Sequence, residues 1–341
     1  MIRRTACLVA RGVDPYRNLA IEKHLMDTLP EDTAILYLWQ NQHTIVIGRN
    51  QNPRAELRVE EFLRSGGRIA RRLSGGGAVY HDLGNLNFTF VVPKADFDIP
   101  RQLSAVALAV SAFGVKVQAS GRNDLHAQGR KFSGNAFYKA GAAAYHHGTL
   151  LVASDTDSMA RFLTVDEKKL EGRGVPSVPA RVVNLCQLCP SLTVDALQNA
   201  MCAAFARVYG AQPAWLDERM LDQASLARWT EWFSSEDWLF LDEPDATFDV
   251  SERFPWGGVT VRLAVEGGVI RRARMYTDAM EAALFTRMEQ MLERTPFLIS
   301  AIAGRFDQRL SEMTDPRLAQ MAGDVCTLIC GCIRDQNRRQ A

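Results

Sequence analysis

Three consecutive glycines, Gly75 to Gly77, constrain the fold of this chain more than any other stretch of its sequence. They follow a short extended run at residues 68–70 and precede residues 86–92, where apolar side chains recur at every second position: Leu86, Phe88, Phe90 and Val92. A period of two is typical of strands with one buried face, so the glycines are predicted to turn the chain between two strands. Because they lack side chains, they also let an anion approach backbone N–H groups.

Two arginines, Arg71 and Arg72, precede the glycines and carry forked donors that suit phosphate or carboxylate. Many glycine-rich loops, however, only turn a hairpin. The stretch is not a Walker A loop, since no Gly-Lys-Ser or Gly-Lys-Thr follows it, and it is not a dinucleotide-binding fingerprint, since no helix opens after it. The glycine loop alone is compatible with an anion site and with a plain turn, and other motifs are needed to distinguish the two.

Apolar runs and capping signals elsewhere predict an α+β fold. Residues 34–39 and 44–48 are predicted to be neighbouring buried strands, and Asp14-Pro15 to begin a helix that runs to about Leu29. Further helices are predicted at residues 56–64, 101–113 and 194–209. Several consecutive strands are joined by turns too short for a crossover, which favours a mixed or antiparallel sheet with helices packed on it.

The chain of 341 residues is long enough for two domains. We predict a catalytic domain at residues 1–248 and a small α+β accessory domain at residues 254–341. In the accessory domain, Trp256-Gly257-Gly258 precedes strands at residues 259–265 and 269–276 and then further helices. The Trp-rich stretch from about residue 170 to 250 is predicted to be packed connection apart from the helix at 194–209. Residues 245–254 are the predicted hinge.

The charge balance gives no sign of a polyanionic partner. Lys and Arg number 40 and Asp and Glu 39, a net charge of +1, so the sequence predicts binding neither to nucleic acid nor to a membrane surface. It has no secretory signal pattern and no run of about 18 apolar residues, which predicts a cytoplasmic protein. The seven cysteines are then expected to be reduced. Cys186 and Cys189 have the spacing of a metal or redox pair, but no second pair accompanies them, so a structural role is the ordinary interpretation.

Further motifs follow one another along the chain. They are Asn18 to Glu22, Gly48 to Pro53, Ser120 to Leu125, Arg130 to Ala136 and His146 to Val152. Together with the glycine loop, and in this order, they closely resemble the lipoate-protein ligase A family, which shares a superfamily with biotin ligases and octanoyltransferases. The resemblance covers most of the chain. It implies a catalytic domain of the biotin/lipoate ligase type and an accessory C-terminal domain that moves during turnover.

The resemblance also implies an activity. Such ligases use ATP and Mg²⁺ to convert free lipoate to lipoyl-AMP, and then transfer the lipoyl group to a lysine of a carrier. The carriers are the lipoyl domains of 2-oxoacid dehydrogenase E2 subunits and the glycine cleavage H protein. Because both reactants of the first step are anions, the site needs cations and backbone donors. The glycine loop can supply the donors, and Arg72 and Lys131 the cations.

By this resemblance, Lys131 is the expected catalytic residue and also reaches the lipoate carboxyl. Arg72 and His147 are the other expected lipoate-binding residues. A point charge on a flexible stem suits the shift of negative charge from carboxylate to leaving phosphate. From the residues alone, Lys131 could equally be a solvated surface lysine. The expected ATP-binding residues are Arg72, Ser74, Gly75, Gly76, Gly77, Ala78, Val79, Tyr80, Asn123, Asp124 and Lys131.

Several residues keep two interpretations. Asp124 could hold Mg²⁺, with Asn123 orienting it, or the two could form an Asx turn. His146 and His147 are adjacent in a predicted strand, so they should point to opposite faces and only one can line a pocket. His81 could cap the glycine turn. The acyl slot is predicted to be narrow and apolar, with walls such as Trp39, Val46, Val79 and Phe88.

Three activities are compatible with these motifs. An ATP-dependent lipoate ligase uses both the glycine loop and the Lys131 motif. An ATP-independent octanoyltransferase of the same fold needs a cysteine nucleophile near that lysine, and no cysteine lies between Cys7 and Cys186. A non-catalytic lipoate-binding or adenylate-binding module would not need both activation motifs. Pyrophosphate release from ATP in the presence of Mg²⁺ and lipoate separates the three.

Overall fold

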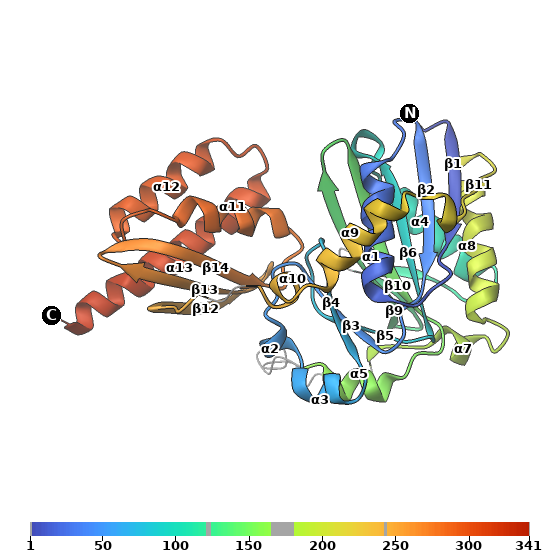
Figure 1. Ribbon diagram of the computed structural model, residues 1–341, viewed down its shortest axis with the longest axis horizontal. Helices are drawn as coiled ribbons and strands as arrows, with labels where there is room; N and C mark the ends of the chain where they lie inside the picture. Colours follow the sequence, from blue (N-terminus) through green and yellow to red (C-terminus); the bar gives the residue numbers. More distant parts are fainter. Residues whose placement is uncertain (1, 121–123, 165–180, 242–243, 341) are drawn as a thin grey trace. The chain divides into compact units, whose positions relative to one another are not determined.

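The computed structural model describes residues 2–120, 124–164, 181–241 and 244–340. The chain divides into two compact units. The first comprises Met1–Ile47, Pro53–Arg72 and Ala78–Leu239, and the second comprises Gly48–Asn52, Leu73–Gly77 and Phe240–Ala341. Each unit combines a sheet with packed helices, so the predicted α+β fold is confirmed (Figure 1).

A mixed sheet of eight strands is the framework of the first unit, in the order β11-β1-β2-β6-β10-β9-β8-β7. Its strands are β1 (Arg4–Val9), β2 (Thr33–Trp39), β6 (Asn85–Pro93), β7 (Gln118–Ser120), β8 (Asp124–Ala127), β9 (Arg130–Ala140), β10 (Ala143–Leu151) and β11 (Ala214–Trp215). β1 pairs in parallel with β2 and β11, and the other neighbours are antiparallel. The predicted mixed sheet is confirmed, since hairpins such as β8-β9 need only short turns.

Helices cover both faces of this sheet (Figure 1). α4 (Ile99–Ser111) and α8 (Val194–Tyr209) pack together on one face, and α1 (Pro15–Asp27) and α9 (Gln223–Ser234) pack together on the other. Alternation along each strand assigns its side chains to these two faces. On β2, Leu36 and Leu38 join the core beneath α4 and α8, whereas the Tyr37 hydroxyl donates to Asn18 Oδ1 of α1 at 3.1 Å.

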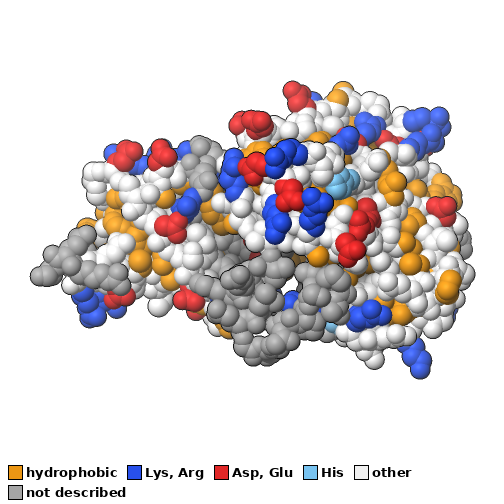
Figure 2. Space-filling view, turned by 90° about the horizontal axis from the view of Figure 1, so that it is seen from below, with side chains coloured by type: hydrophobic (Ala, Val, Ile, Leu, Met, Phe, Trp, Pro, Cys, Tyr) orange, Lys and Arg blue, Asp and Glu red, His pale blue; other side chains and the backbone are white. Residues whose placement is uncertain are grey.

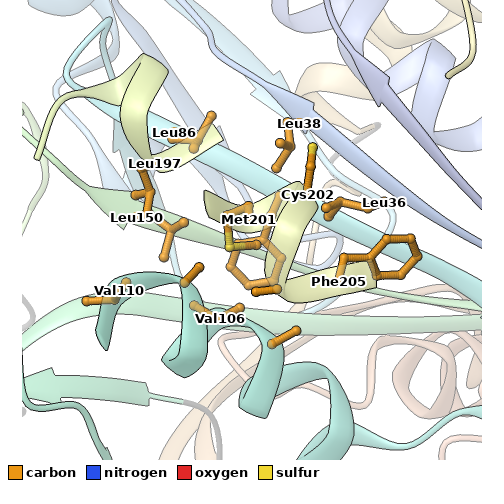
Figure 3. Close-up of a cluster of buried hydrophobic side chains, with 14 of the residues drawn as sticks. Leu36, Leu38, Leu86, Val106, Val110, Leu150, Leu197, Met201, Cys202 and Phe205 are labelled. Atoms are coloured by element: carbon orange, nitrogen blue, oxygen red, sulfur yellow. The ribbon is translucent and has the colours of Figure 1, made fainter. Parts of the chain in front are cut away.

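The apolar core lies between the sheet and the α4–α8 pair. Figure 3 shows Val106 and Val110 of α4 beside side chains of α8 and of the strands β2, β6 and β10. β6 contributes Leu86, Phe88, Phe90 and Val92 to this core, which confirms the predicted alternation. Burying one such side chain contributes about 1.5–3 kcal/mol, so this apolar face stabilises the unit. The opposite face, beneath α1, holds polar groups.

A smaller sheet of three strands ends at Arg71, the first of the two arginines that precede the glycine loop. β3 (Thr44–Ile47) lies between β4 (Arg68–Arg71), to which it is parallel, and β5 (Val79–His81), to which it is antiparallel. The glycine loop therefore connects the two outer strands of this sheet. The prediction that residues 34–39 and 44–48 are neighbouring strands is wrong, because β1 and β6 occupy both edges of β2.

Capping side chains account for where the principal helices begin. The Asp14 side chain accepts the N–H groups of Tyr16 and Arg17, with proline at the start of the helix, as predicted for α1. The helix predicted at 101–113 begins at Ile99, because Asp98 accepts the Arg101 N–H at 3.1 Å. α8 has the predicted bounds. The shorter helices are α2 (Pro53–Glu56), α3 (Val59–Arg64), α5 (Thr156–Phe162), α7 (Leu185–Leu188) and α10 (Glu236–Phe240).

The prediction of packed connection from about residue 170 to 250 is wrong for residues 223–234, which form α9. Asp222 caps this helix by accepting the N–H groups of Ala224 and Ser225. Its buried residues, Leu226 and Phe233, lie within the first unit. Three of the tryptophans that suggested an irregular segment form an aromatic cluster instead: Trp229, Trp232 and Trp238.

The second unit has its own antiparallel sheet and helical layer. The sheet has the order β12-β13-β14, with β12 (Phe248–Phe254), β13 (Gly257–Glu266) and β14 (Val269–Thr277). The helices are α11 (Ala282–Leu292), α12 (Ile299–Ser311) and α13 (Pro316–Gln340). The strands predicted at 259–265 and 269–276 are confirmed. β12 was missed, and because its residues pair with β13, residues 248–254 cannot serve as the predicted hinge. The predicted domain limits, 1–248 and 254–341, stay a prediction.

Charged side chains of both signs lie on the face of the described residues that Figure 2 shows. Figure 2 shows acidic and basic side chains interspersed over the visible face, as expected for a net charge of +1. Within the described ranges, no helix is both long enough and apolar enough to cross a bilayer.

Candidate functional site

Lys131 lies in β9, beside the hairpin turn that joins this strand to β8. Gln128 and Gly129 form the turn with φ angles of 50° and 75°, as in a two-residue type I′ hairpin. The hairpin brings Lys131 Nζ to 2.9 Å from Asp124 Oδ1, and these side chains are 39% and 30% exposed. Residues 132–134 after Lys131 continue β9. The ion pair is open enough for a ligand anion to compete for the cation.

Gly134 makes room for the Lys131 side chain. A Cβ at Gly134 would lie 2.9 Å from Lys131 Nζ and 3.0 Å from Lys131 Cε. The Lys131 carbonyl also accepts the Val183 N–H at 2.9 Å, which holds the backbone at this point. The next residue, Phe132, belongs to the core beneath α4 and α8, so Lys131 lies on the opposite face of the sheet.

A buried polar cluster occupies the α1 face of the same sheet. Glu22 of α1 is 2% exposed, and its Oε1 lies 2.8 Å from His147 Nδ1 and accepts the Thr89 hydroxyl at 2.7 Å. The Trp39 indole N–H donates to Thr89 Oγ1 at 3.0 Å. These contacts fix the rings of His147 and Trp39 against the sheet.

Arg72 follows β4 and is buried among the groups of this cluster. Its Nη1 donates to the Val46 carbonyl at 3.0 Å. Burial lowers the pKa of Arg72 to about 10, while Tyr145 and Glu22 oppose the shift. The guanidinium therefore stays charged at neutral pH. Burial, followed by Glu22, raises the pKa of Tyr145 well above its usual range, so Tyr145 is a neutral phenol at this site.

The adjacent histidines of β10 serve different faces, as predicted. His146 Nδ1 lies 3.1 Å from Gln102 Oε1 of α4, and burial lowers its pKa to about 3. His147 instead contacts Glu22 of α1. His146 is thus a neutral side chain of the structural core, whereas His147 belongs to the polar cluster.

His81 was expected to cap the glycine turn, but its side chain is buried. Its Nδ1 lies 3.1 Å from Asn41 Nδ2. Burial, followed by the electrostatic effects of Arg72 and His147, lowers the pKa of His81 to about 3, so the ring is neutral. Its Nε2 is buried with no hydrogen-bond partner among the residues that the structure describes, and the same holds for Asn87 Nδ2. Buried polar atoms of this kind ordinarily meet water or a ligand.

Arg71 does not serve the anion site, contrary to the expectation for both arginines. It is fully buried, and its guanidinium donates to the carbonyls of Trp238 at 2.8 Å and Leu239 at 2.6 Å. The Trp238 indole N–H donates back to the Arg71 carbonyl at 2.9 Å. Arg71 therefore anchors residues 238–239 to β4.

Phe88 does not line an acyl slot with Trp39, because its side chain lies in the core on the other face of the sheet. Val79 and Tyr80 belong to β5, directly after Ala78. The Tyr80 hydroxyl lies 3.0 Å from His43 Nδ1. The structure therefore separates Phe88 from Trp39 and places Val46 and Val79 in the three-stranded sheet.

Residues 73–77 of the glycine loop fold with the C-terminal unit. The Gly76 N–H donates to the Ala279 carbonyl at 3.0 Å, and the Ser74 carbonyl accepts the Arg49 N–H at 2.9 Å. Gly76 has a φ of 90°, which favours glycine. A Cβ on Gly75 would lie 2.4 Å from the Ala279 oxygen. The expectation that the loop presents successive N–H groups to an anion is wrong for Gly76 in this arrangement, since its N–H is already bonded.

The described residues bear on the predicted magnesium site at Asn123 and Asp124. Asn123 lies outside the described residues, and Asp124 contributes a single carboxylate. Among the residues that are described, no group of three or more His, Cys, Asp or Glu side chains could hold a metal ion. Glu22 and Tyr145 are neighbours of Arg72 that the sequence did not predict. Glu22 belongs to one of the quoted motifs, but nothing in its spacing indicated a buried carboxylate.

Comparisons with known proteins agree along the chain. The family model described as the lipoyl protein ligase A/B catalytic domain matches residues 14–206. A second model, the bacterial lipoate protein ligase C-terminus, matches residues 243–316. The first match lies in the first unit except for residues 48–52 and 73–77, and the second match lies in the second unit.

Solved structures resemble the fold over most of its length. A crystal structure of P. falciparum LipL1 in complex with lipoate is 22% identical, with a TM-score of 0.83, and the match covers 95% of this chain and 99% of that one. A bipartite lipoate protein ligase with its E2 lipoyl domain from Thermoplasma acidophilum is 25% identical, with a TM-score of 0.62 over 72% of this chain and 99% of that one. Lipoate-protein ligase A bound with ATP is 25% identical, with a TM-score of 0.60 over 70% and 99%.

Proposed function

Because the chain belongs to the lipoyl protein ligase A/B family, we propose that it is an ATP-dependent lipoate-protein ligase. The observation that carries the proposal is the half-exposed ammonium of Lys131, 2.9 Å from Asp124 Oδ1. Lys131 lies on the sheet face that also holds Arg72 and the buried polar cluster. A cation on that face suits a reaction between two anions. Binding of ATP to a related ligase, as in one of the matched structures, supports the use of the nucleotide.

In the first step, a lipoate carboxylate oxygen attacks the α-phosphorus of ATP. The bond from that phosphorus to the pyrophosphate oxygen breaks, which yields lipoyl-AMP and pyrophosphate. Lys131 exchanges Asp124 for the ligand and offsets the charge on the phosphoryl group as it moves to the leaving oxygen. Arg72 adds a fixed positive charge that burial keeps from being screened by water.

In the second step, the neutral amine of a carrier lysine attacks the acyl carbon. The bond from that carbon to the AMP oxygen breaks, an amide forms, and the amine loses a proton. The proposed carriers are lipoyl domains of 2-oxoacid dehydrogenase E2 subunits and the glycine cleavage H protein. The presence of an E2 lipoyl domain with the matched archaeal ligase supports this class of partner.

The acyl chain is proposed to extend along the α1 face, away from Lys131. His147 pairs with Ala136, five residues along β9 from Lys131, or roughly 16 Å at about 3.3 Å per residue. Glu22, Thr89 and Trp39 then bound the far end of the slot. Four buried methylenes contribute roughly 3 kcal/mol, so an octanoyl chain should be accepted with only modestly lower affinity.

Mg²⁺ fits the described residues only as an ion held chiefly by nucleotide phosphates. Asp124 offers one carboxylate, and magnesium sites of this class commonly use one or two carboxylates with substrate phosphates. When bound, Mg²⁺ would neutralise charge on those phosphates. The chain's own contribution is the Asp124 carboxylate and the Lys131 ammonium beside it.

The first test is pyrophosphate release by purified protein with ATP, Mg²⁺ and lipoate. Lys131→Ala should lower the rate by about 10²–10³-fold, as for loss of one group that stabilises the transition state, without changing the melting temperature. A rate within a few-fold of wild type would remove Lys131 from the mechanism. A wild-type protein that releases no pyrophosphate would overturn the ligase assignment.

The octanoyltransferase alternative has one candidate thiol. Cys186 lies three residues after Val183, whose N–H donates to the Lys131 carbonyl at 2.9 Å. Cys186→Ser should leave ATP-dependent lipoylation intact if the protein is a ligase. If the protein instead transfers octanoyl groups without ATP, the same substitution should abolish transfer.

A further inference from the structure

We propose that Asn50 is a positioning residue for the adenylation step, because it fastens the segment of residues 277–282 beneath the glycine loop. The inference rests on the proposed ligase function and assigns a role to the Gly48 to Pro53 motif. All the contacts that carry it lie within the C-terminal unit.

The Gly48 to Asn52 segment is a tight turn packed against the glycine loop. The Gly48 N–H donates to Gln51 Oε1 at 2.8 Å, and the Gln51 N–H donates back to the Gly48 carbonyl at 3.1 Å. A Cβ on Gly48 would lie 2.1 Å from the Gly76 carbonyl oxygen. The two backbones therefore approach closely only because residue 48 has no side chain.

Asn50 joins this turn to the end of β14 and the start of α11. Its carbonyl accepts the Thr277 N–H at 2.9 Å, and its side-chain Nδ2 donates to the Ala282 carbonyl at 3.0 Å. Asn50 is 8% exposed. The two bonds span both ends of the 277–282 segment, which contains the Ala279 carbonyl that receives the Gly76 N–H.

The opposite side of this segment is held by the start of β13. Thr277 Oγ1 donates to the Gly258 carbonyl at 2.7 Å, and Asp278 Oδ1 accepts the Gly258 N–H at 2.8 Å. A Cβ on Gly257 would lie 2.9 Å from Asp278 Oδ1, so this close approach favours glycine at residue 257. The start of β13 thus holds one side of the segment, and the Asn50 side chain bonds the other side.

The consequence for the reaction concerns the conformation of the glycine loop. The loop has no regular secondary structure of its own between β4 and β5, and Gly76 takes a positive φ of 90°. Its shape depends on partners such as Ala279 and Arg49. Loss of the Asn50 amide frees the Ala282 end of the support and lets the loop depart from the conformation that receives ATP.

The experiment measures the two half-reactions separately on the full chain. Asn50→Ala removes the side chain, and Asn50→Asp keeps its volume but places an oxygen against the Ala282 carbonyl. Both should reduce lipoyl-AMP formation by about tenfold or more and raise the KM for ATP, as for loss of a buried hydrogen bond. Transfer from lipoyl-AMP supplied ready-made should stay within about twofold of wild type, because that step does not need the loop conformation that receives ATP.

Val325→Ala is the matched control, because Val325 is fully buried in the core of the same unit. It should lower the melting temperature without separating the half-reactions. Equal losses in both half-reactions for Asn50→Ala, or adenylation within about twofold of wild type, would overturn the positioning role. A wild-type protein without adenylation would instead refute the ligase proposal itself.

Discussion

Replacing Gly134 by alanine should lower activity while slightly raising stability. The added Cβ would lie 2.9 Å from Lys131 Nζ and 3.0 Å from Lys131 Cε, so the flexible end of the lysine must move. Gly134 is not among the glycines with positive φ, so alanine suits its backbone and should stabilise the fold by about 0.4–1 kcal/mol through the unfolded chain. A displacement of the ammonium by about 1 Å can cost about 10²-fold in rate.

The assay combines pyrophosphate release with thermal unfolding. Gly12→Ala is the matched control, since a Cβ there meets nothing within 4 Å and Gly12 also lacks a positive φ. It should show the same stabilisation with unchanged activity. In the double variant with Lys131→Ala, the Gly134 substitution should cost no further activity, because its effect acts through the lysine. Wild-type activity in Gly134→Ala, or additive losses in the double variant, would refute this reasoning.

Three further predictions follow from the contacts described. Gly76→Val should weaken ATP binding and also lower the melting temperature, because a β-branched residue is strained at a φ of 90°; titration calorimetry beside a thermal melt checks both. Below pH 6.5 the unfolding free energy should fall by up to about 1.4 kcal/mol per pH unit for each of His81 and His146. The pKa of each is lowered to about 3, so in this range only the unfolded chain binds the proton. Urea unfolding at pH 7.5 and 5.5 should show this loss, and His146→Gln should reduce it. Truncation after Leu239 should preserve lipoate binding and transfer from ready-made lipoyl-AMP. It should impair adenylation, because Asn50 and Gly76 lose their partners at residues 277–282. Normal adenylation by the truncated protein would show that the glycine loop needs no such support.

Local patterns were sufficient for the elements with strong periodicity and capping. Asp14-Pro15 predicted the start of α1, and the apolar spacing predicted α8 with its observed bounds. The alternation at residues 86–92 predicted which side chains of β6 enter the core. Caps and side-chain periods are properties of a few consecutive residues, so they can be read without knowledge of the rest of the chain.

Such local patterns did not predict which distant strands pair with one another. β2 and β3 are close in sequence, but they belong to different sheets because β1 and β6 occupy both edges of β2. α9 was missed because its tryptophans obscured the helical period. Strand neighbours depend on which other strands compete for the same edge, and this is settled only when the whole sheet forms.

By itself, the sequence determined the family resemblance and the position of Lys131 and the glycine loop in the chain. The tertiary structure decided what surrounds them. It assigned Arg71 to an anchoring role through Trp238 and Leu239, placed the carboxylate of Glu22 beside His147, and bonded the Gly76 N–H to Ala279. The physical reason is that a charged or polar group acts according to its burial and its partners, and in this chain those partners lie from tens to hundreds of residues away.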